Sequence, residues 1–273
     1  MHRRLDIDQL RHLGMALLWL VVMALLAWVT MRQCTHKVSD GYAAPSTGLC
    51  DSLLQHSVHE TQRVDYLGFV SYFNAARHLP LCVTYELTAS ELSGEEQRTD
   101  AFAVDPSAPG CPPPDAYQGT GLHRGHLAPA ADMHWSEKAM RQSFLMTNIC
   151  PQHRSLNEGG WGRLEEKCRE WVKRDHALVI ACGPVIEAGL DTIAGTGIPI
   201  PRRFFKVVLA HWARPMRALA FVYPNGPANG PLSRYVTTID NVEQLTGIDF
   251  FALLPDDEQR QLESNSNLPL WLH

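Results

Sequence analysis

The chain has 273 residues, of which 45% are hydrophobic, and its formal net charge at pH 7 is -5. That apolar fraction is typical of globular proteins, so it excludes an intrinsically disordered chain and predicts one large domain or two small ones. Because the mild negative charge gives no overall attraction to a polyanion, any binding of nucleic acid must come from a local basic patch.

The N-terminal segment predicts a membrane helix. Residues 13–31 carry no formal charge, and a helix of this length spans roughly the 30 Å hydrocarbon layer. The arginines before it favour an N-terminus inside the cell. We expect cytoplasmic residues at 1–12, a single-pass anchor at 13–31, and the remainder outside the cytoplasm, in a bacterial periplasm or an organelle's intermembrane space. A cleaved signal peptide is the competing interpretation, but the apolar run exceeds the usual length of roughly 7–15 residues.

The cysteine pattern favours disulfides over zinc. No two cysteines form a CxxC pair and no HExxH motif occurs, so the spacing gives no zinc signature. In an exported domain we expect disulfides, with Cys34 as the unpaired residue and the pairing of the others open. The seven cysteines are Cys34, Cys50, Cys82, Cys111, Cys150, Cys168 and Cys182.

Residues 32–62 are polar and rich in turn formers, which predicts a stalk before a folded domain at 63–273. In that domain a proline-rich loop is expected between residues 89 and 120. Dense β-branched and aromatic residues predict strands. Because strands and helices alternate too irregularly for a parallel sheet, we expect an α+β fold. The predicted strands are residues 81–88, 177–186, 203–210 and 218–224.

Two helices are expected after residue 130. The first runs from Ser136, a plausible N-cap, to about residue 146, and the second from about residue 157 to 174. In the second helix, Asn157, Trp161, Glu165 and Cys168 share one stripe. The apolar C-terminal segment 267–273 is suited to pack back onto the domain.

The residues between Arg98 and Glu165 include the groups needed to cut a phosphodiester. His126 can serve as a base near neutral pH. Arg124 and Arg98 offer planar guanidinium groups that match phosphate oxygens. Asn157 and Glu165 offer the oxygen atoms that Mg²⁺ accepts. Taken singly, each has an ordinary structural explanation, so their combination carries the hypothesis.

That combination resembles a known family. The blocks are His-Arg-Gly-His at 123–126, Thr-Asn-Ile-Cys-Pro-Gln at 147–152 and Asn-x-x-x-Trp-x-x-Leu-Glu at 157–165. They resemble the DNA/RNA non-specific endonucleases of the ββα-metal superfamily, and weaker similarity extends over roughly residues 65–270. The resemblance implies a ββα-metal core with a mostly antiparallel sheet, in which a strand end carries the base and the following helix carries the metal ligand.

The resemblance also implies a role for each matching residue. His126 matches the general base, Asn157 the single direct protein ligand of Mg²⁺, and Glu165 the residue that holds metal-bound water. Arg124 matches the arginine beside the base, and Arg98 the phosphate-facing arginine. Asn148 matches an asparagine near the site, which we interpret as support for the geometry.

The implied reaction is hydrolysis of DNA and RNA to 5′-phosphate products. The expected cofactor is Mg²⁺, with Mn²⁺ or another divalent cation as alternatives. Little sequence preference follows if the contacts go to phosphate and sugar. A homodimer stays open as an assembly state.

One position departs from the family pattern. The family has Asp where this chain has His123, so a carboxylate is lost. If that acid anchors the loop, a hydrogen bond from His123 substitutes for it; if it tunes the site electrostatically, we expect lower activity. Two alternatives stay open: a metal site made of His123 and His126, and a degenerate nuclease fold that binds nucleic acid at the cell envelope without cutting it.

Overall fold

The computed structural model describes residue 58 and residues 60–272. The predicted anchor at 13–31 and most of the predicted stalk lie outside these residues. Among the residues described, no helix combines the length and the apolar character that crossing a bilayer requires.

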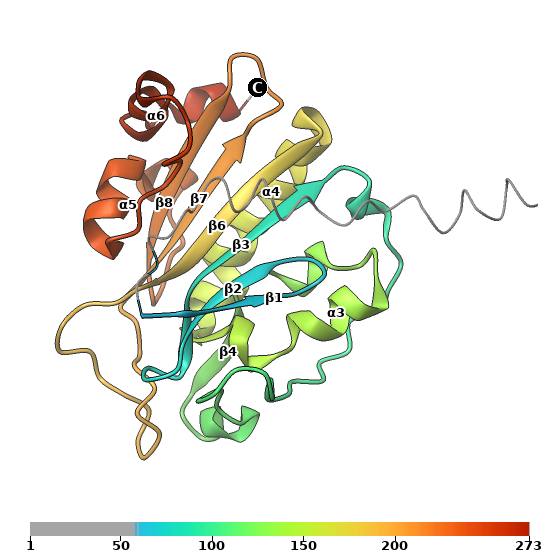
Figure 1. Ribbon diagram of the computed structural model, residues 1–273, viewed down its shortest axis with the longest axis vertical. Helices are drawn as coiled ribbons and strands as arrows, with labels where there is room; N and C mark the ends of the chain where they lie inside the picture. The colour runs from blue at the N-terminus through green and yellow to red at the C-terminus, as the bar shows by residue number, and fades with distance from the viewer. Residues whose placement is uncertain (1–57, 59, 273) are drawn as a thin grey trace, which may run out of the picture. The chain divides into compact units, whose positions relative to one another are not determined.

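A seven-stranded sheet forms the centre of the domain, with the strand order β1-β2-β3-β6-β7-β8-β9 (Figure 1). Each strand pairs antiparallel with its neighbours. The strands are β1 (Gln62–Asp65), β2 (Val70–Asn74), β3 (Leu79–Thr88), β6 (Ala177–Val185), β7 (Arg203–Ala210), β8 (Arg217–Pro224) and β9 (Val236–Thr237).

Both faces of this sheet are covered, so most residues of its central strands are buried and apolar. On β7, successive side chains alternate between faces: Phe204 packs against Trp161 on one side, and Phe205 packs against Phe250 on the other. The first face carries α4 (Gly162–Asp175). The second carries α5 (Ile239–Thr246) and α6 (Asp256–Glu263).

A separate two-stranded sheet, β4 (Leu122–His126) and β5 (Ile149–His153), lies on the α4 side of the domain. The chain between these strands forms α3 (Glu137–Ser143), and the chain after them forms a π-helical turn at Leu156–Trp161 that leads into α4. The remaining short turns are 3-10 helices at Glu91–Ser93, Pro114–Tyr117, Ala130–Asp132, Met146–Asn148, Leu232–Arg234 and Leu268–Trp271.

The α+β class, the antiparallel sheet and the four predicted strands are confirmed, and β7 matches its predicted range residue for residue. The first predicted helix begins as expected, because the Ser136 side chain accepts a hydrogen bond from the backbone N–H of Ala139. It ends three residues early, at Ser143. The second predicted helix is interrupted by the π-helical turn, in which Gly159 has non-helical angles of φ -111° and ψ -105°.

The prediction of disulfides is wrong for the cysteines that the structure describes, because all five are free thiols. Cys82 and Cys182 lie on neighbouring strands, but Cys82 packs in the core on the α5 side and Cys182 in the core on the α4 side. Side chains on opposite faces of a sheet cannot form a bridge. Cys34 and Cys50 lie outside the described residues.

Candidate active site

The hairpin of β4 and β5 positions His126. Its register pairs His126 with Ile149 and Gly125 with Cys150. A Cβ atom at Gly125 would lie 2.2 Å from Oε1 of the buried Gln152, so only glycine fits here. The close approach of the two strands fixes the backbone of the residue directly before His126.

The His126 ring is enclosed by aromatic side chains. Its centroid lies 5.4 Å from that of Phe102 and 4.8 Å from that of Phe144, and the residue is 7% exposed. Nε2 is buried and makes no hydrogen bond. Burial, helped by the nearby charge of Arg98, lowers the pKa of His126 from 6.5 to about 3. The imidazole is therefore neutral at physiological pH.

Two arginines stand beside this base on aromatic rings. The guanidinium carbon of Arg124 lies 4.1 Å from the centroid of Phe102, and that of Arg98 lies 5.0 Å from the centroid of Phe144. Nε of Arg98 also donates to Oδ1 of Asp100 over 2.7 Å. Stacking orients both guanidinium groups, and the terminal N–H groups of Arg98 make none of the described hydrogen bonds.

The π-helical turn presents Asn157 to the same cleft. Nδ2 of Asn157 lies 3.2 Å from Nδ1 of His123, which accepts its hydrogen bond when that nitrogen is unprotonated. Oε1 of Glu158 lies 3.7 Å from the same nitrogen. The residue that departs from the family pattern therefore contacts the predicted metal ligand, and the Asn157 amide oxygen stays available.

Glu165 reaches the cleft from the first turn of α4. Burial raises its pKa to about 7, an effect that the charge of Lys206 opposes and that of Asp132 reinforces. Lys206 is fully buried on β7, and its ammonium lies 4.5 Å from the ring centroid of Trp161. Sequence reasoning missed Lys206; a lysine within the apolar strand RFFKVVLA was the available signal.

Asn148 is fully buried and is held by backbone hydrogen bonds. Its Nδ2 donates to the carbonyl oxygens of Ala128 and Ser143, each over 2.8 Å, and its Oδ1 accepts from the backbone N–H of Ala128 over 2.9 Å. These bonds tie the segment after β4 to the end of α3 and the start of β5. That Asn148 supports the geometry of the site stays a prediction.

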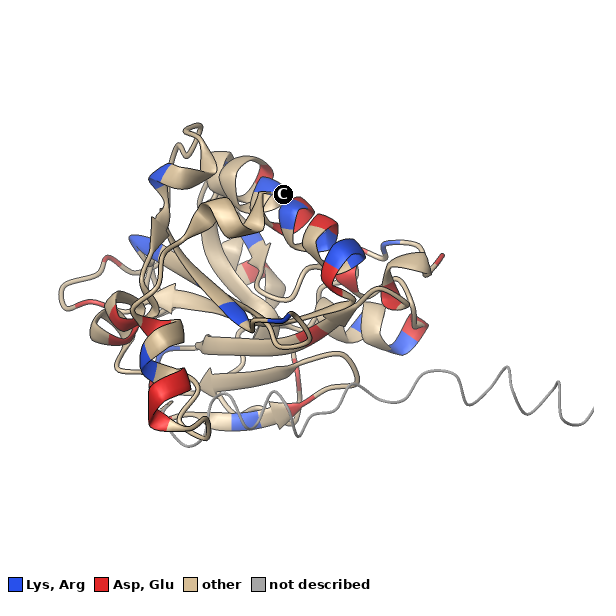
Figure 2. Ribbon diagram, turned by 90° about the horizontal axis from the view of Figure 1, so that it is seen from above, with Lys and Arg blue, Asp and Glu red and all other residues tan. Residues whose placement is uncertain are grey.

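These groups surround one cleft of about 910 Å³. It brings together the predicted residues Arg98, His123, Arg124, His126, Asn157 and Glu165, whereas Asn148 is not among its lining residues. Asp115, Tyr117 and Gln118 also line it, and nothing in their loop sequence marked them. Figure 2 shows acidic and basic residues distributed over the whole ribbon, so the paired arginines form a local feature of the cleft.

The arrangement does not support a zinc site made of His123 and His126. Within the described part of the chain, no further His, Cys, Asp or Glu joins this pair at a metal-ligand spacing. Zinc sites require three or four protein ligands. A neutral imidazole, two cations and a pair of oxygen donors in one cleft suit acid–base chemistry on an anionic substrate instead.

Comparison with known proteins identifies the same residues as part of a family domain. The model of the DNA/RNA non-specific endonuclease family matches residues 52–257. The mitochondrial nuclease EXOG of Xenopus laevis is 29% identical over 216 residues, covering 72% of this chain and 60% of that protein. A nuclease of Nostoc sp. is 31% identical over 205 residues, covering 70% of this chain and 74% of that protein.

A solved structure agrees at the level of the fold. The crystal structure of an EndoG/EndoGI complex matches with a TM-score of 0.69 at 20% identity, covering 81% of this chain and 96% of that chain. The chain spans 60% of the length of the EXOG proteins that it matches in Xenopus laevis and Mus musculus. Since the family model covers most of the sequence, including every residue of the cleft, the chain belongs to the DNA/RNA non-specific endonuclease family.

Proposed function

We propose that the chain is a metal-dependent endonuclease that hydrolyses phosphodiester bonds of DNA and RNA, with little sequence preference and with 5′-phosphate products. The observation that carries the proposal is a neutral, enclosed His126 beside two stacked arginines in one cleft. Family membership supports the same reaction class.

His126 acts as the general base in this proposal. Because Nε2 is enclosed by protein, Nδ1 is the ring nitrogen that takes the proton from the attacking water. The rings of Phe102 and Phe144 fix the orientation of the imidazole. A base that is already unprotonated needs no prior loss of a proton when the substrate arrives.

Arg124 and Arg98 bind the phosphate. Their guanidinium groups match phosphate oxygens and stabilise the negative charge that grows on them during the attack. Neither role depends on the identity of a base, since phosphate contacts carry no sequence information directly. This is the physical ground for the proposed lack of sequence preference.

Asn157 and Glu165 fit a divalent cation, because an amide oxygen and a carboxylate that face one cleft are the hard donors that Mg²⁺ accepts. In the proposal Asn157 holds the ion directly and Glu165 holds water around it. When bound, the ion supplies a Lewis acid that stabilises the charge on the phosphate and on the leaving 3′ oxygen. Mn²⁺ is an alternative ion for the same donors.

The test is digestion of plasmid and of RNA by the purified 273-residue chain. With Mg²⁺ both are degraded, and the DNA products can be ligated without added phosphate because each carries a 5′-phosphate. EDTA or His126→Ala abolishes digestion. His134→Ala, a matched change of a histidine outside the cleft, leaves the rate unchanged.

The contradicting outcome is specific. If the parent chain leaves plasmid intact with Mg²⁺ and with Mn²⁺ yet retards it on a gel, the protein binds nucleic acid without cutting it. The degenerate-fold alternative would then hold.

We propose in addition that residues 13–31 anchor the chain in a membrane, with the nuclease domain outside the cytoplasm. The supporting observation is the uncharged sequence of that segment. In intact spheroplasts, added protease should digest the nuclease domain; complete protection would contradict the proposed orientation. A homodimer stays a prediction.

A further inference from the structure

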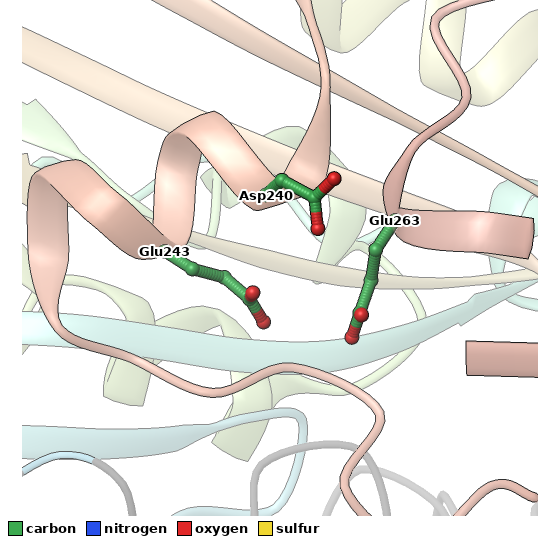
Figure 3. A group of neighbouring side chains, drawn as sticks. All are labelled: Asp240, Glu243 and Glu263. Atoms are coloured by element: carbon green, nitrogen blue, oxygen red, sulfur yellow. The ribbon is translucent and has the colours of Figure 1, made fainter. Parts of the chain in front are cut away.

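A second group of polar side chains lies on the face of the sheet that α5 and α6 cover, away from the cleft. Asp240 and Glu243 stand one turn apart on α5, and Glu263 is the last residue of α6. One carboxylate oxygen from each lies within 4.8 Å of the others. Figure 3 shows the three carboxylates gathered in the space between the two helices.

Glu263 is the member whose surroundings point to a missing ligand. The residue is 6% exposed, and its Oε1 is buried without a hydrogen-bond partner. A buried polar atom without a partner destabilises the folded state, and more so when it carries charge. Its place at the C-terminal end of α6 adds to the cost, because the partial charge of a helix C-terminus is negative.

The three carboxylates have no ion-pair partner among the described residues. In the part of the chain that the structure describes, no lysine or arginine forms an ion pair with any of the three carboxylates, and Arg260 of α6 pairs with Asp257 instead. One oxygen of Glu243 accepts a hydrogen bond from the backbone N–H of Phe250 over 2.8 Å. That bond leaves the rest of the acidic group without a neutralising partner.

We propose that Asp240, Glu243 and Glu263 bind a calcium ion that joins α5 to α6. Calcium takes carboxylate oxygens at roughly 2.3–2.6 Å, so oxygens on opposite sides of one ion lie about 4.6–5.2 Å apart. One oxygen from each carboxylate lies within 4.8 Å of the other two, so the three groups are close enough to share one ion. Magnesium, with bonds of about 2.0–2.1 Å, requires a tighter octahedral arrangement.

The bound ion would act on stability. Ile239 and Val242 of α5 and Leu262 of α6 pack on the same face of the sheet, so both helices are already held near each other by apolar contacts. The ion neutralises the carboxylates that these contacts bring together. Because the cleft lies on the other face, we expect phosphodiester cleavage to be unaffected by the loss of this site.

The first test compares melting temperatures of the purified 273-residue chain in EDTA and in calcium. We expect calcium to raise the melting temperature of the parent chain by more than that of Glu263→Gln, in which only the nuclease cleft can still bind the ion. In EDTA the variant should melt at or above the parent temperature, because the substitution removes one of three repelling carboxylates. Glu258→Gln, an exposed change on the same helix, should keep the calcium response of the parent.

The second test separates this site from the nuclease cleft, where divalent ions also bind in our proposal. Isothermal titration of Asn157→Ala with CaCl₂ should show one equivalent bound, and Asn157→Ala combined with Glu263→Gln should show none. Asp240→Asn in place of Glu263→Gln should give the same loss, which covers a Glu263 variant that fails to fold. An Asn157→Ala chain that binds no calcium, or a calcium response unchanged by either substitution, would overturn the proposal.

Discussion

The surroundings of His126 lower its basicity in the free protein, and in the proposed reaction a bound phosphate would raise it again. Aromatic rings and the charges of Arg98 and Arg124 hold the pKa of His126 near 3. A phosphate that pairs with both arginines neutralises their charge and adds negative charge beside the ring, and both effects raise that pKa. The imidazole thus becomes a stronger base when it has a proton to accept.

The same lowered pKa predicts a pH-dependent stability. As pH falls below about 6.5, the unfolded chain protonates this histidine while the folded chain does not until about pH 3. The free energy of unfolding should therefore fall by about 1.4 kcal/mol per pH unit in that window. Urea denaturation from pH 7 to pH 4 should give a steeper decline for the parent than for His126→Leu. Parallel profiles would show that the histidine protonates equally in both states.

At position 123 the chain lacks the carboxylate of the family pattern, and His123 instead forms a hydrogen bond with Asn157. The effect of that hydrogen bond can be tested. His123→Ala removes the acceptor for Nδ2 of Asn157, so the amide is free to rotate. Loss of a group that orients a metal ligand typically costs 10–100-fold in metal affinity or activity. We expect about that increase in the Mg²⁺ concentration needed for half-maximal cleavage.

His123→Asp supplies the comparison, because a carboxylate also accepts from Asn157 and adds negative charge near the ion. This variant should need less Mg²⁺ than the parent. His134→Ala should match the parent. Equal Mg²⁺ requirements for the parent and His123→Ala would mean that the hydrogen bond does not orient Asn157.

At the scale of the elements, the sequence predicts the strands that a hydrophobic pattern marks. It misses elements that depend on distant pairing or on unusual backbone angles. Buried strands such as β7 can be predicted because apolar residues occupy most of their positions. The strand character of β4 is hidden, because its residues LHRGH have no apolar alternation and their pairing depends on distant β5. The π-helical turn is hidden because a glycine with non-helical angles produces it.

The candidate site shows the same division. Sequence motifs predicted that His126, Arg124, Asn157 and Glu165 belong to one site, because each lies in a short block with fixed spacing, and the structure brings them to one cleft. The contact between His123 and Asn157 bridges β4 and the turn before α4, so no local pattern encodes it. Lys206 comes from β7, and its buried charge opposes the rise in the pKa of Glu165. Only the folded chain shows that these two residues lie near each other.

The tight hairpin at Gly125 gives a prediction for these elements. Gly125→Ala places a Cβ within 2.5 Å of Cγ, Cδ and Oε1 of Gln152, so the buried side chain must move. Overpacking of this kind costs about 1–3 kcal/mol. Urea denaturation should show that loss, and cleavage should slow because His126 follows directly. Gln152→Ala removes the clashing atoms, so adding it should restore most of the stability; no recovery in the double variant would locate the strain elsewhere.

At the scale of the whole domain, the two covered faces of the sheet carry two different candidate sites. The α4 face holds the cleft, whereas the α5 and α6 face holds the proposed calcium group. The C-terminal segment connects to the first of these faces, since the backbone carbonyl of Trp271 accepts a hydrogen bond from Arg174 of α4 over 3.2 Å. The helix that carries Glu165 is thus supported by residues nearly a hundred positions later in the chain.

Trp271 should therefore contribute measurably to the free energy of unfolding of the domain, whereas its loss should leave the cleavage rate unchanged. It is 1% exposed, its ring centroid lies 4.8 Å from that of Trp171, and the Arg217 guanidinium carbon lies 5.2 Å from its ring. Replacing a buried tryptophan by alanine costs about 3–5 kcal/mol. We expect that loss from Trp271→Ala in urea denaturation, with cleavage kept at low urea. Leu272→Ala, at a residue that is 57% exposed, should cost under about 0.5 kcal/mol. Equal losses from both variants would mean that the segment does not pack on α4 in solution.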